Sequence, residues 1–248
     1  MNQLVILVPT YNEAISILEL LEKLENFRVE SKYKFDLVVI DDNSPDRTAE
    51  IVEKLAITWV QVMKRSHKDG LGAAYRAGIL KVLGNAKYTH IVTMDADGSH
   101  RVEDLPAMFL AMESSTSKKS MVLGTRWMPG GRVVNWPKFR QLLSRSGTKY
   151  AKLALGMNLD DLTGGFRIYS SELLNSIKIN EMNATGYCFQ IEMAMAAEIV
   201  EAETVQVPIT FIERSNGKSK MSGWIAIEAL NFITKNGIKR ILVRSYRR

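Results

Sequence analysis

The sequence predicts an α/β fold in which a mostly parallel sheet is covered by helices on both faces. Two observations lead to this prediction. Continuous apolar runs of strand length alternate with segments of helical spacing, and clusters of polar residues follow three of these runs. Strands that are apolar along their whole length are typical of parallel sheets buried on both faces. Right-handed crossovers between such strands give a doubly wound, Rossmann-like arrangement.

Most of this alternation lies in the first hundred residues. The elements predicted there are strands at 4–8, 36–40 and 90–94 and helices at 12–27, 44–56 and 70–83. Ser44 is expected to cap the second helix, with Pro45 at its first position. In open α/β sheets ligands bind beyond the carboxyl ends of the strands. The polar clusters PTYNE, DDNSPD and DADGSH, which follow the three strands, should therefore meet at one edge and form a site.

The second half of the chain is less regular. The elements predicted there are strands at 121–126 and 204–215, a loop that enters a strand at 161–170, and helices from about 139 to 156 and at 186–200. Pro208 indicates an edge strand or a bulge. From Gly223 onward the sequence is amphipathic, with apolar residues at roughly helical spacing. No linker that would separate independent domains is evident.

The composition is that of a globular protein with a substantial core, since 46% of the 248 residues are hydrophobic and 24% are charged. The longest stretch without a charged residue is 1–12, which is too short to span a bilayer and lacks the basic start of a secretion signal. The single cysteine, Cys188, excludes an internal disulfide and suits a reducing compartment. We therefore expect a cytoplasmic protein without a transmembrane helix.

The net charge of +6 is unevenly placed, because no acidic residue follows Glu228. The segment 224–248 could lie at an anionic membrane surface, or it could pack on the rest of the protein and end in a solvated tail. A nucleic-acid-binding protein is the alternative suggested by the pI of 9.3. That alternative does not explain acidic clusters at strand ends, and signatures of nucleic-acid-binding motifs are missing. We therefore expect no nucleic-acid partner.

The apolar run at 90–94 ends on Asp95 and Asp97, whose carboxylates can converge once the strand gives way to a loop. Two such carboxylates repel each other unless a proton or a cation lies between them. An oxygen-rich ligand set favours Mg²⁺ or Mn²⁺ over zinc, and substrate phosphates commonly complete magnesium sites. Since the chain has no GxxxxGK[ST] loop, the pattern favours a nucleotide diphosphate bound through a metal. The alternative is that the two aspartates only solvate a turn.

Basic residues in predicted loops and at element ends could neutralise such phosphates. They are Arg126, Arg140, Arg167, Arg214, Lys218 and Lys220. Arginine suits phosphate because its guanidinium donates two parallel hydrogen bonds. Arg140 and Ser144 are four residues apart on a predicted helix, so they could share one face and hold one phosphate. Taken singly, each of these residues is more often a solvated surface charge.

These motifs, taken in order and spacing, resemble those of a known family. VPTYNE, DDNSPDRT, GLGAAYRAG, MDADGSH, GTR, DLTGGFRIY, GYCFQIEM and ERSNGKSK look like the motifs of the dolichol-phosphate (polyprenol-phosphate) mannosyltransferases within glycosyltransferase family 2. The resemblance implies a GT-A fold with a catalytic domain at 1–223. A nucleotide-binding half at 1–100 and an acceptor-binding half at 101–223 would make up this domain, followed by the basic amphipathic segment at 224–248.

The resemblance also implies an activity. It is the inverting transfer of mannose from GDP-mannose to dolichol or polyprenol phosphate, with Mg²⁺ or Mn²⁺ as cofactor. The enzyme would be peripheral on the cytoplasmic face of an anionic membrane, and a small membrane-anchoring subunit would be a further partner to test. Two alternatives stay open: a related enzyme with another sugar nucleotide of the UDP-glucose type, or one with another acceptor.

By position, the resemblance implies four groups of site residues. Those that hold the donor nucleoside are Pro9, Tyr11, Glu13, Ile40 and Asp42. Those at the metal are Asp95, Asp97 and Ser99, with Ala96 against the nucleotide. Those that contact the donor phosphate and sugar are Arg126, Arg214 and Lys220. Those at the acceptor phosphate are Arg140 and Ser144.

Asp161 and Gly165 lie in the motif DLTGGFRIY. We hypothesise that Asp161 orients the sugar or the acceptor rather than acting as an obligate base. The alternative is that its carboxylate caps the loop before Thr163. Gly165 stands where the family commonly has serine, which is a departure in the loop expected to hold the acceptor.

Overall fold

The fold is built on a seven-stranded sheet, and the computed structural model describes residues 3–184, 186–213 and 223–246. The strand order is β3-β2-β1-β4-β7-β5-β8. β7 runs antiparallel to both of its neighbours, whereas the other pairs are parallel. The strands are β1 (Leu4–Thr10), β2 (Phe35–Asp41), β3 (Val60–Lys64), β4 (His90–Thr93), β5 (Ser120–Thr125), β7 (Arg167–Ser170) and β8 (Glu203–Pro208). The expected mostly parallel sheet is therefore confirmed.

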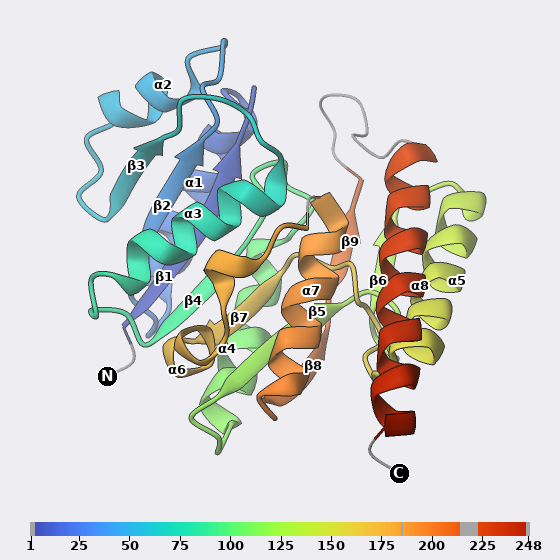
Figure 1. Ribbon diagram of the computed structural model, residues 1–248. Coiled ribbons are helices and arrows are strands. Elements are labelled where there is room, and N and C mark those ends of the chain that lie inside the picture. Colours follow the sequence, from blue (N-terminus) through green and yellow to red (C-terminus); the bar gives the residue numbers. More distant parts are fainter. Residues whose placement is uncertain (1–2, 185, 214–222, 247–248) are drawn as a thin grey trace.

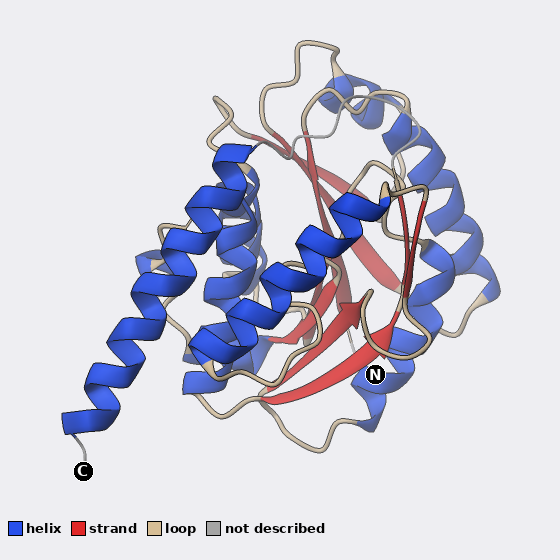
Figure 2. Cartoon of the chain, turned by 90° about the vertical axis from the view of Figure 1, so that its right-hand side faces the viewer, coloured by secondary structure: helices blue, strands red, loops and turns tan. Residues whose placement is uncertain are grey.

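Helices cover both faces of this sheet, and a view turned by 90° places the strands between two helical layers (Figures 1 and 2). The α-helices are α1 (Ser16–Glu30), α2 (Thr48–Lys54), α3 (Leu71–Leu83), α4 (Leu105–Ser114), α5 (Lys138–Leu155), α6 (Ser171–Ser176), α7 (Gly186–Ile199) and α8 (Gly223–Tyr246). Two short 3₁₀ helices are η1 (Val102–Asp104) and η2 (Ile179–Glu181). The predicted helices at the positions of α1, α3, α5 and α7 are confirmed.

The two helical layers follow from the strands, whose side chains alternate between the faces. On β1, Leu4, Ile6 and Val8 pack with residues of α1 and α4. Val5 and Leu7 point to the other face and pack with residues of α3 and α7. All five side chains are at most 3% exposed. A strand buried on both faces needs an apolar residue at every position, which explains the continuous runs in the sequence.

The segment 204–215, predicted as one strand, contains two strands that belong to different sheets. β8 ends at Pro208, and β9 (Thr210–Ile212) pairs in parallel with β6 (Arg132–Val134) in a separate two-stranded sheet. Pro208 marks the break, because proline cannot donate a hydrogen bond to a strand ladder. β9 also forms an isolated antiparallel bridge with His100, which brings the small sheet next to the loop after β4.

The predicted start of α2 is wrong. The helix begins at Thr48, preceded by Arg47 in the left-handed region with φ of 62°. The Ser44 hydroxyl instead donates to Oδ1 of Asp41 over 2.6 Å and accepts the Asn12 N–H over 3.1 Å. Ser44 therefore joins the loops after β1 and β2 to each other and does not cap a helix.

The C-terminal helix α8 packs against α5 and α7 (Figure 1). Ile233 is 4% exposed and belongs to the core cluster on that face of the sheet. Gly237 permits the close approach to α5, because a β-carbon there would lie 3.0 Å from the carbonyl oxygen of Ala154. Within the described residues, no helix combines the length and apolar character that a membrane crossing requires.

Candidate active site

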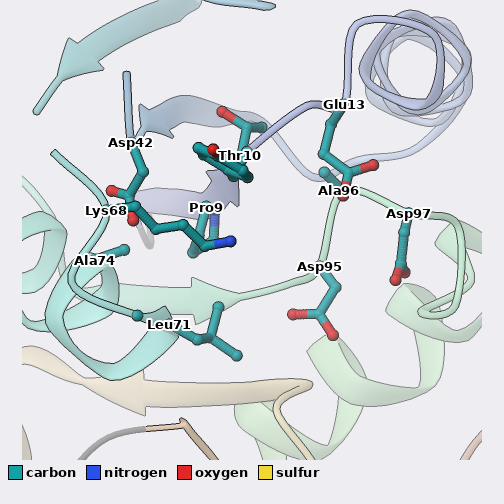
Figure 3. A pocket seen from close by; sticks show the side chains of 12 residues that line it. Pro9, Thr10, Glu13, Asp42, Lys68, Leu71, Ala74, Asp95, Ala96 and Asp97 are labelled. Atoms are coloured by element: carbon teal, nitrogen blue, oxygen red, sulfur yellow. The ribbon is translucent and has the colours of Figure 1, made fainter. Parts of the chain in front are cut away.

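The loops after β1, β2 and β4 meet at the carboxyl edge of the sheet and line a cavity of about 150 Å³, the first cavity (Figure 3). Its lining residues are Pro9, Thr10, Tyr11, Glu13, Asp42, Lys68, Gly70, Leu71, Ala74, Asp95, Ala96 and Asp97. The cavity lies where the strand order reverses between β1 and β4, which is the usual ligand position in open α/β sheets. The polar clusters that follow three strands in the sequence therefore do meet.

Most of the acidic cluster after β2 holds the loops in place. Asp41 Oδ1 accepts the Thr10 hydroxyl over 2.9 Å, and its Oδ2 accepts the Ser44 N–H over 2.9 Å. Asp46 Oδ2 accepts the N–H of Ala14 over 3.0 Å. These bonds join the loops after β1 and β2, and they satisfy one backbone donor in each loop. Within this acidic cluster, only Asp42 lines the first cavity.

Asp42 is 4% exposed and forms an ion pair with Arg65, whose Nη1 lies 2.5 Å from Asp42 Oδ1. Burial raises the pKa of Asp42 above its ordinary value, although Arg65 opposes the shift. Arg65 also reaches Asp69 over 3.2 Å. Arg65 thus ties Asp42 to the loop that leads into α3.

Lys68, which the sequence did not single out, supplies positive charge on the same side of the first cavity. Its Nζ lies 3.8 Å from the centroid of the Tyr11 ring. Lys68 and Asp42 lie on one side of the cavity, opposite Asp95 and Asp97 (Figure 3). The amino end of α3 lines the cavity as well, and such helix ends attract anions.

Asp95 and Asp97 lie in the loop after β4 and are held by different partners. Asp95 Oδ1 accepts the buried Tyr75 hydroxyl over 3.2 Å, and the Asp95 N–H donates to His100 Nδ1 over 3.0 Å. Burial, with Asp95 adding to it, raises the pKa of Tyr75 well above its ordinary value, so the hydroxyl stays a donor. Asp97 Oδ1 accepts the Ser99 N–H over 3.0 Å, in a turn that Gly98 permits with φ of 75°.

The donor set of this loop suits a hard divalent cation. Both carboxylates point to the same side of the loop in the close view (Figure 3). No group of three histidine, cysteine, aspartate or glutamate side chains that could bind a metal occurs in the described part of the chain. Two carboxylates without a third ligand fit Mg²⁺ or Mn²⁺, because substrate phosphates and water commonly complete such a shell.

A second cavity borders the same two aspartates. Its lining residues are Asp95, Asp97, Ser99, His100, Arg126, Trp136, Arg140, Thr163, Gly164, Gly165, Phe211 and Glu213. It therefore shares Asp95 and Asp97 with the first cavity. A molecule that extends from one cavity into the other must pass these carboxylates.

Arg126 and Asp161 form a buried ion pair at this second cavity. Arg126 Nε and Nη2 lie 2.6 and 2.8 Å from the two oxygens of Asp161, which is fully buried. Burial acts to raise the pKa of Asp161, but Arg126 and Arg167 outweigh it and lower that pKa below its ordinary value. Asp161 Oδ1 also accepts the Gly164 N–H over 3.0 Å. The carboxylate therefore does cap the 161–164 loop, and it contacts Arg126 instead of the cavity.

Arg140 lies over the Trp136 ring at 4.0 Å, and its Nη1 lies 2.5 and 2.6 Å from the two oxygens of Glu213. Arg126 lies over the same indole at 5.4 Å. The second cavity therefore brings two guanidinium groups to one aromatic ring, next to the acidic loop. Ser144, one turn along α5 from Arg140, lines a different cavity. The pair predicted to hold one phosphate is divided between adjoining cavities.

This third cavity is apolar and measures about 310 Å³. It is lined by residues of α5, α7 and α8 and of the loop before β7, namely Leu143, Ser144, Ser146, Gly147, Thr148, Tyr150, Ala151, Leu162, Thr163, Ile191, Ala229, Leu230 and Ile233. Thr163 lines both the second and the third cavity. The second cavity thus adjoins both of the others through shared lining residues, and the third is the apolar one.

Some predicted site residues are not found in these cavities. The Ile40 side chain is fully buried and packs on Gly78 of α3, where a β-carbon would lie 2.3 Å from its Cδ1. Arg167 is also fully buried, and its guanidinium donates to backbone carbonyls. Arg214 and Lys220 lie outside the described residues.

Comparison with known sequences now identifies the family. The model of the family described as Glycosyl transferase family 2 matches residues 5–178. The chain belongs to glycosyltransferase family 2. Among relatives of this family-2 chain, the undecaprenyl-phosphate mannosyltransferase of Micrococcus luteus is 40% identical over 94% of this chain and 93% of its own length. The polyprenol monophosphomannose synthase of Mycolicibacterium smegmatis is 37% identical over 97% and 89%. The predicted resemblance is confirmed.

Solved structures share the fold of this family-2 protein. Glucosyl-3-phosphoglycerate synthase from Mycobacterium tuberculosis, solved with Mn²⁺, UDP and phosphoglyceric acid, superposes with a TM-score of 0.70 at 17% identity over 95% of this chain and 78% of that chain. The same enzyme solved with Mg²⁺ and UDP gives a TM-score of 0.69 at 17% identity over 95% and 79%. The GT-A fold expected from the sequence is confirmed.

Several residues of this glycosyltransferase site were missed by sequence reasoning. Tyr75 could have been found, because it follows Leu71 by four residues and so shares a face of α3 with a residue at the site. Trp136 carried no such signal, and Glu213, which opens the motif ERSNGKSK, was given no role of its own. They meet only through β6 and β9, which are far apart in the sequence and pair in the small sheet.

Proposed function

We propose that this protein transfers mannose from GDP-mannose to the phosphate of a polyprenol or dolichol phosphate, with inversion at the sugar. The series of three adjoining cavities carries this proposal. It offers a cavity with both charged and apolar walls for a nucleotide, a cationic and aromatic cavity for phosphate, and an apolar cavity for a hydrocarbon chain. The two relatives at 37% and 40% identity are named for mannose and polyprenol phosphates, which supports the same substrates here.

The reaction requires no strong general base. An oxygen of the acceptor phosphate attacks C1 of the sugar, and the bond from C1 to the diphosphate oxygen breaks as the nucleoside diphosphate leaves. A phosphomonoester has its second pKa near 6, so the acceptor is mostly a dianion at neutral pH and has no proton to lose. Attack opposite the leaving group turns an α-mannosyl donor into a β-linked lipid product.

Asp95 and Asp97, with Ser99 beside them, would hold a divalent cation at the junction of the first and second cavities. When bound there, Mg²⁺ or Mn²⁺ stabilises the negative charge that develops on the departing diphosphate. Tyr75 and His100 keep the Asp95 carboxylate and backbone in place by hydrogen bonds. The nucleoside lies between Tyr11 and Asp42 in the first cavity, and Arg214 and Lys220 stay predicted donor contacts.

Arg126 and Arg140 bring two anions together in the second cavity. Arg126 contacts the sugar or the donor phosphate, and Asp161 acts through Arg126 as a positioning residue, since its own oxygens face that guanidinium. Arg140 binds the acceptor phosphate. Glu213 pairs with Arg140 in the described state, so acceptor binding displaces or shares this ion pair. Ser144 lies where the lipid leaves the phosphate site.

The lipid acceptor requires access from a membrane surface, which α5 and α8 can provide. α5 contains five basic residues and no acidic residue (KFRQLLSRSGTKYAKLAL). It also exposes apolar side chains, with Phe139 at 76%, Leu142 at 64% and Leu153 at 73% exposure. On α8, Ile238 and Ile241 are 54% and 65% exposed. Basic helices with exposed apolar residues suit the interface of an anionic bilayer. A peripheral position on the cytoplasmic face is part of the proposal.

The test is to incubate the purified protein with polyprenyl phosphate, Mg²⁺ or Mn²⁺, and each of GDP-mannose, GDP-glucose and UDP-glucose. Mass spectrometry of the lipid extract then identifies the product. We expect a mannosyl phosphate lipid from GDP-mannose that disappears when the metal is chelated. Transfer from UDP-glucose instead, or transfer to a water-soluble acceptor alone, would support the alternative within the same family. A small membrane subunit is tested by adding native membranes.

A further inference from the structure

Gln190 presents an unpaired amide inside the protein. The residue lies on α7 and is 2% exposed. Both Nε2 and Oε1 are buried without a hydrogen-bond partner among the described residues. A buried polar atom left unsatisfied costs about 1–3 kcal/mol. An amide that is unsatisfied at both ends therefore requires an explanation, and it offers both N–H donors and an acceptor oxygen to a ligand.

The backbone around Gln190 is held in place by several hydrogen bonds. Arg167 Nη1 donates to the Gln190 carbonyl over 2.8 Å, while Nε and Nη2 donate to the carbonyls of Gly164 and Leu162 over 2.8 and 3.0 Å. This fully buried guanidinium thus joins α7 to the 162–164 loop. Gly165, which follows this loop, is held as well. Its carbonyl accepts the hydroxyl of Thr93, the last residue of β4, over 2.7 Å. The backbone on both sides of the amide is therefore held in place.

The absence of a side chain at Gly165 leaves space between the amide and the acidic loop. A β-carbon at position 165 would lie 3.4 Å from Gln190 Nε2, 3.6 Å from His100 Cε1 and 3.9 Å from Asp95 Oδ1. Gly165 also lines the second cavity. The position therefore lies at the wall of that cavity, between an unpaired amide and one of the two carboxylates that the first and second cavities share.

We propose that Gln190 binds hydroxyl groups of the transferred sugar across the gap at Gly165 and so determines which sugar is accepted. A sugar joined to a nucleotide in the first cavity and attacked from the second must lie beside Asp95, which lines both. Neighbouring sugar hydroxyls can each donate and accept, which matches the two unpaired ends of the amide. Polar groups that are satisfied only by the correct substrate discriminate strongly against analogues.

This inference rests on the proposed function in taking GDP-mannose as the donor. Its test measures binding without any lipid acceptor, so the result can be interpreted even if lipid transfer fails. Isothermal titration of the full chain in Mn²⁺ measures Kd for GDP, GDP-mannose and GDP-glucose, the last two of which differ at the C2 hydroxyl. In the wild type we expect GDP-mannose to bind more tightly than GDP-glucose. In Gln190→Met we expect this preference to fall about tenfold, while Kd for GDP is unchanged.

Thermal unfolding separates this role from a structural one. Gln190→Met removes an unsatisfied buried amide and keeps the length of the side chain, so Tm should stay level or rise. Met193→Leu, in the same buried helix, is the matched control and should change none of these values.

Three results would overturn the assignment. One is a wild type that binds GDP, GDP-mannose and GDP-glucose with equal affinity. Another is a Gln190→Met variant that keeps its sugar preference. The third is a variant that loses Tm and GDP affinity together, since that pattern shows an amide satisfied by water for structural reasons.

Discussion

Asp95 is held more tightly than a carboxylate in an exposed loop would be, and Tyr75 is the main reason. The phenol lies in the core under the loop, stacked on Phe189 with ring centroids 6.4 Å apart, and it donates to Asp95 Oδ1. A buried donor that orients a metal ligand reduces the freedom of that ligand before the metal binds. Outer partners of this kind commonly change metal affinity by roughly 10- to 100-fold when they are removed.

Tyr75→Phe should therefore weaken Mn²⁺ binding by about 10-fold or more in the presence of GDP. Electron paramagnetic resonance of free Mn²⁺ measures this affinity directly. At saturating Mn²⁺ the kcat of the variant should return part of the way to the wild-type value. Tyr88→Phe is the matched control, because the Tyr88 hydroxyl donates to Asp36 and lines none of the three cavities. Equal Mn²⁺ affinities in the two variants would contradict a role for Tyr75 at the metal.

The Asp161–Arg126 pair makes a prediction about pH. Since the folded protein lowers the pKa of Asp161, ionised Asp161 stabilises the fold at pH values above the ordinary aspartate pKa of about 3.9. That stabilisation is lost as the pH falls below this value and through the lowered folded pKa. Asp161→Asn should cost about 3 kcal/mol or more at pH 7, because it leaves Arg126 buried without its counter-charge.

Thermal unfolding of wild type and Asp161→Asn between pH 7 and pH 3 measures this effect. The two Tm values should differ most at pH 7 and approach each other below about pH 4. Curves that stay parallel over the whole range would show that Asp161 does not contribute through its charge. Asp160→Asn is the control, since the carboxylate of Asp160 forms a half-exposed ion pair with Lys152 and not a fully buried one.

At the scale of helices and strands, the sequence predicted those elements whose burial is uniform. β1, β2 and β4 are apolar along their length, and the polar clusters that follow them predicted the first cavity. β3 was missed because it is an edge strand with half-exposed side chains. α4 was missed because its sequence, LPAMFLAMES, is short and lacks a polar face at helical spacing.

The second and third cavities could be predicted only in part. Arg126 and Arg140 were identified from their motifs, but their aromatic and acidic partners depend on tertiary packing. Trp136 and Glu213 flank the short strands β6 and β9, and nothing in either segment indicates that they pair. The third cavity requires α5, α7 and α8 to lie together, which no local pattern specifies. The pairing of these three-residue strands and the contacts between these helices depend on tertiary packing, which local sequence patterns do not specify.

The third cavity offers a prediction at the scale of α5. Gly147 lines it, and a β-carbon there would meet no atom within 4 Å. Gly147→Leu should therefore fold and fill the cavity with apolar atoms. If the cavity binds the first part of the lipid chain, KM for polyprenyl phosphate should rise about tenfold while KM for GDP-mannose is unchanged.

Gly147→Ala is the matched control, because it adds one methyl group to the same helix without filling the cavity. Alanine in a helix interior is more stable than glycine by about 0.5–1 kcal/mol, so this variant should gain Tm and keep its KM for the lipid. An unchanged lipid KM in Gly147→Leu would place the acceptor chain elsewhere.

At the scale of the whole molecule, the first and third cavities lie in different places and differ in chemical character. The first cavity, with its charged residues, opens at the carboxyl edge of the sheet, whereas the apolar third cavity lies between α5, α7 and α8. For the lipid acceptor proposed above, this arrangement predicts that α5 and α8 face the membrane. In this orientation α5 presents both basic residues and exposed apolar side chains to the bilayer.

The double variant Leu142→Ser, Leu153→Ser tests this orientation. Both leucines are on α5, where they are 64% and 73% exposed, so their replacement should leave the fold intact. Flotation with vesicles that contain phosphatidylglycerol should show wild-type protein bound at low salt and partly released at about 0.5 M salt, as expected for an electrostatic contribution. The double variant should float several-fold less. Ile199→Ser is the control, because Ile199 is 78% exposed at the end of α7 and should not affect binding. Equal flotation of all three proteins would mean that the acceptor is delivered to a surface other than α5.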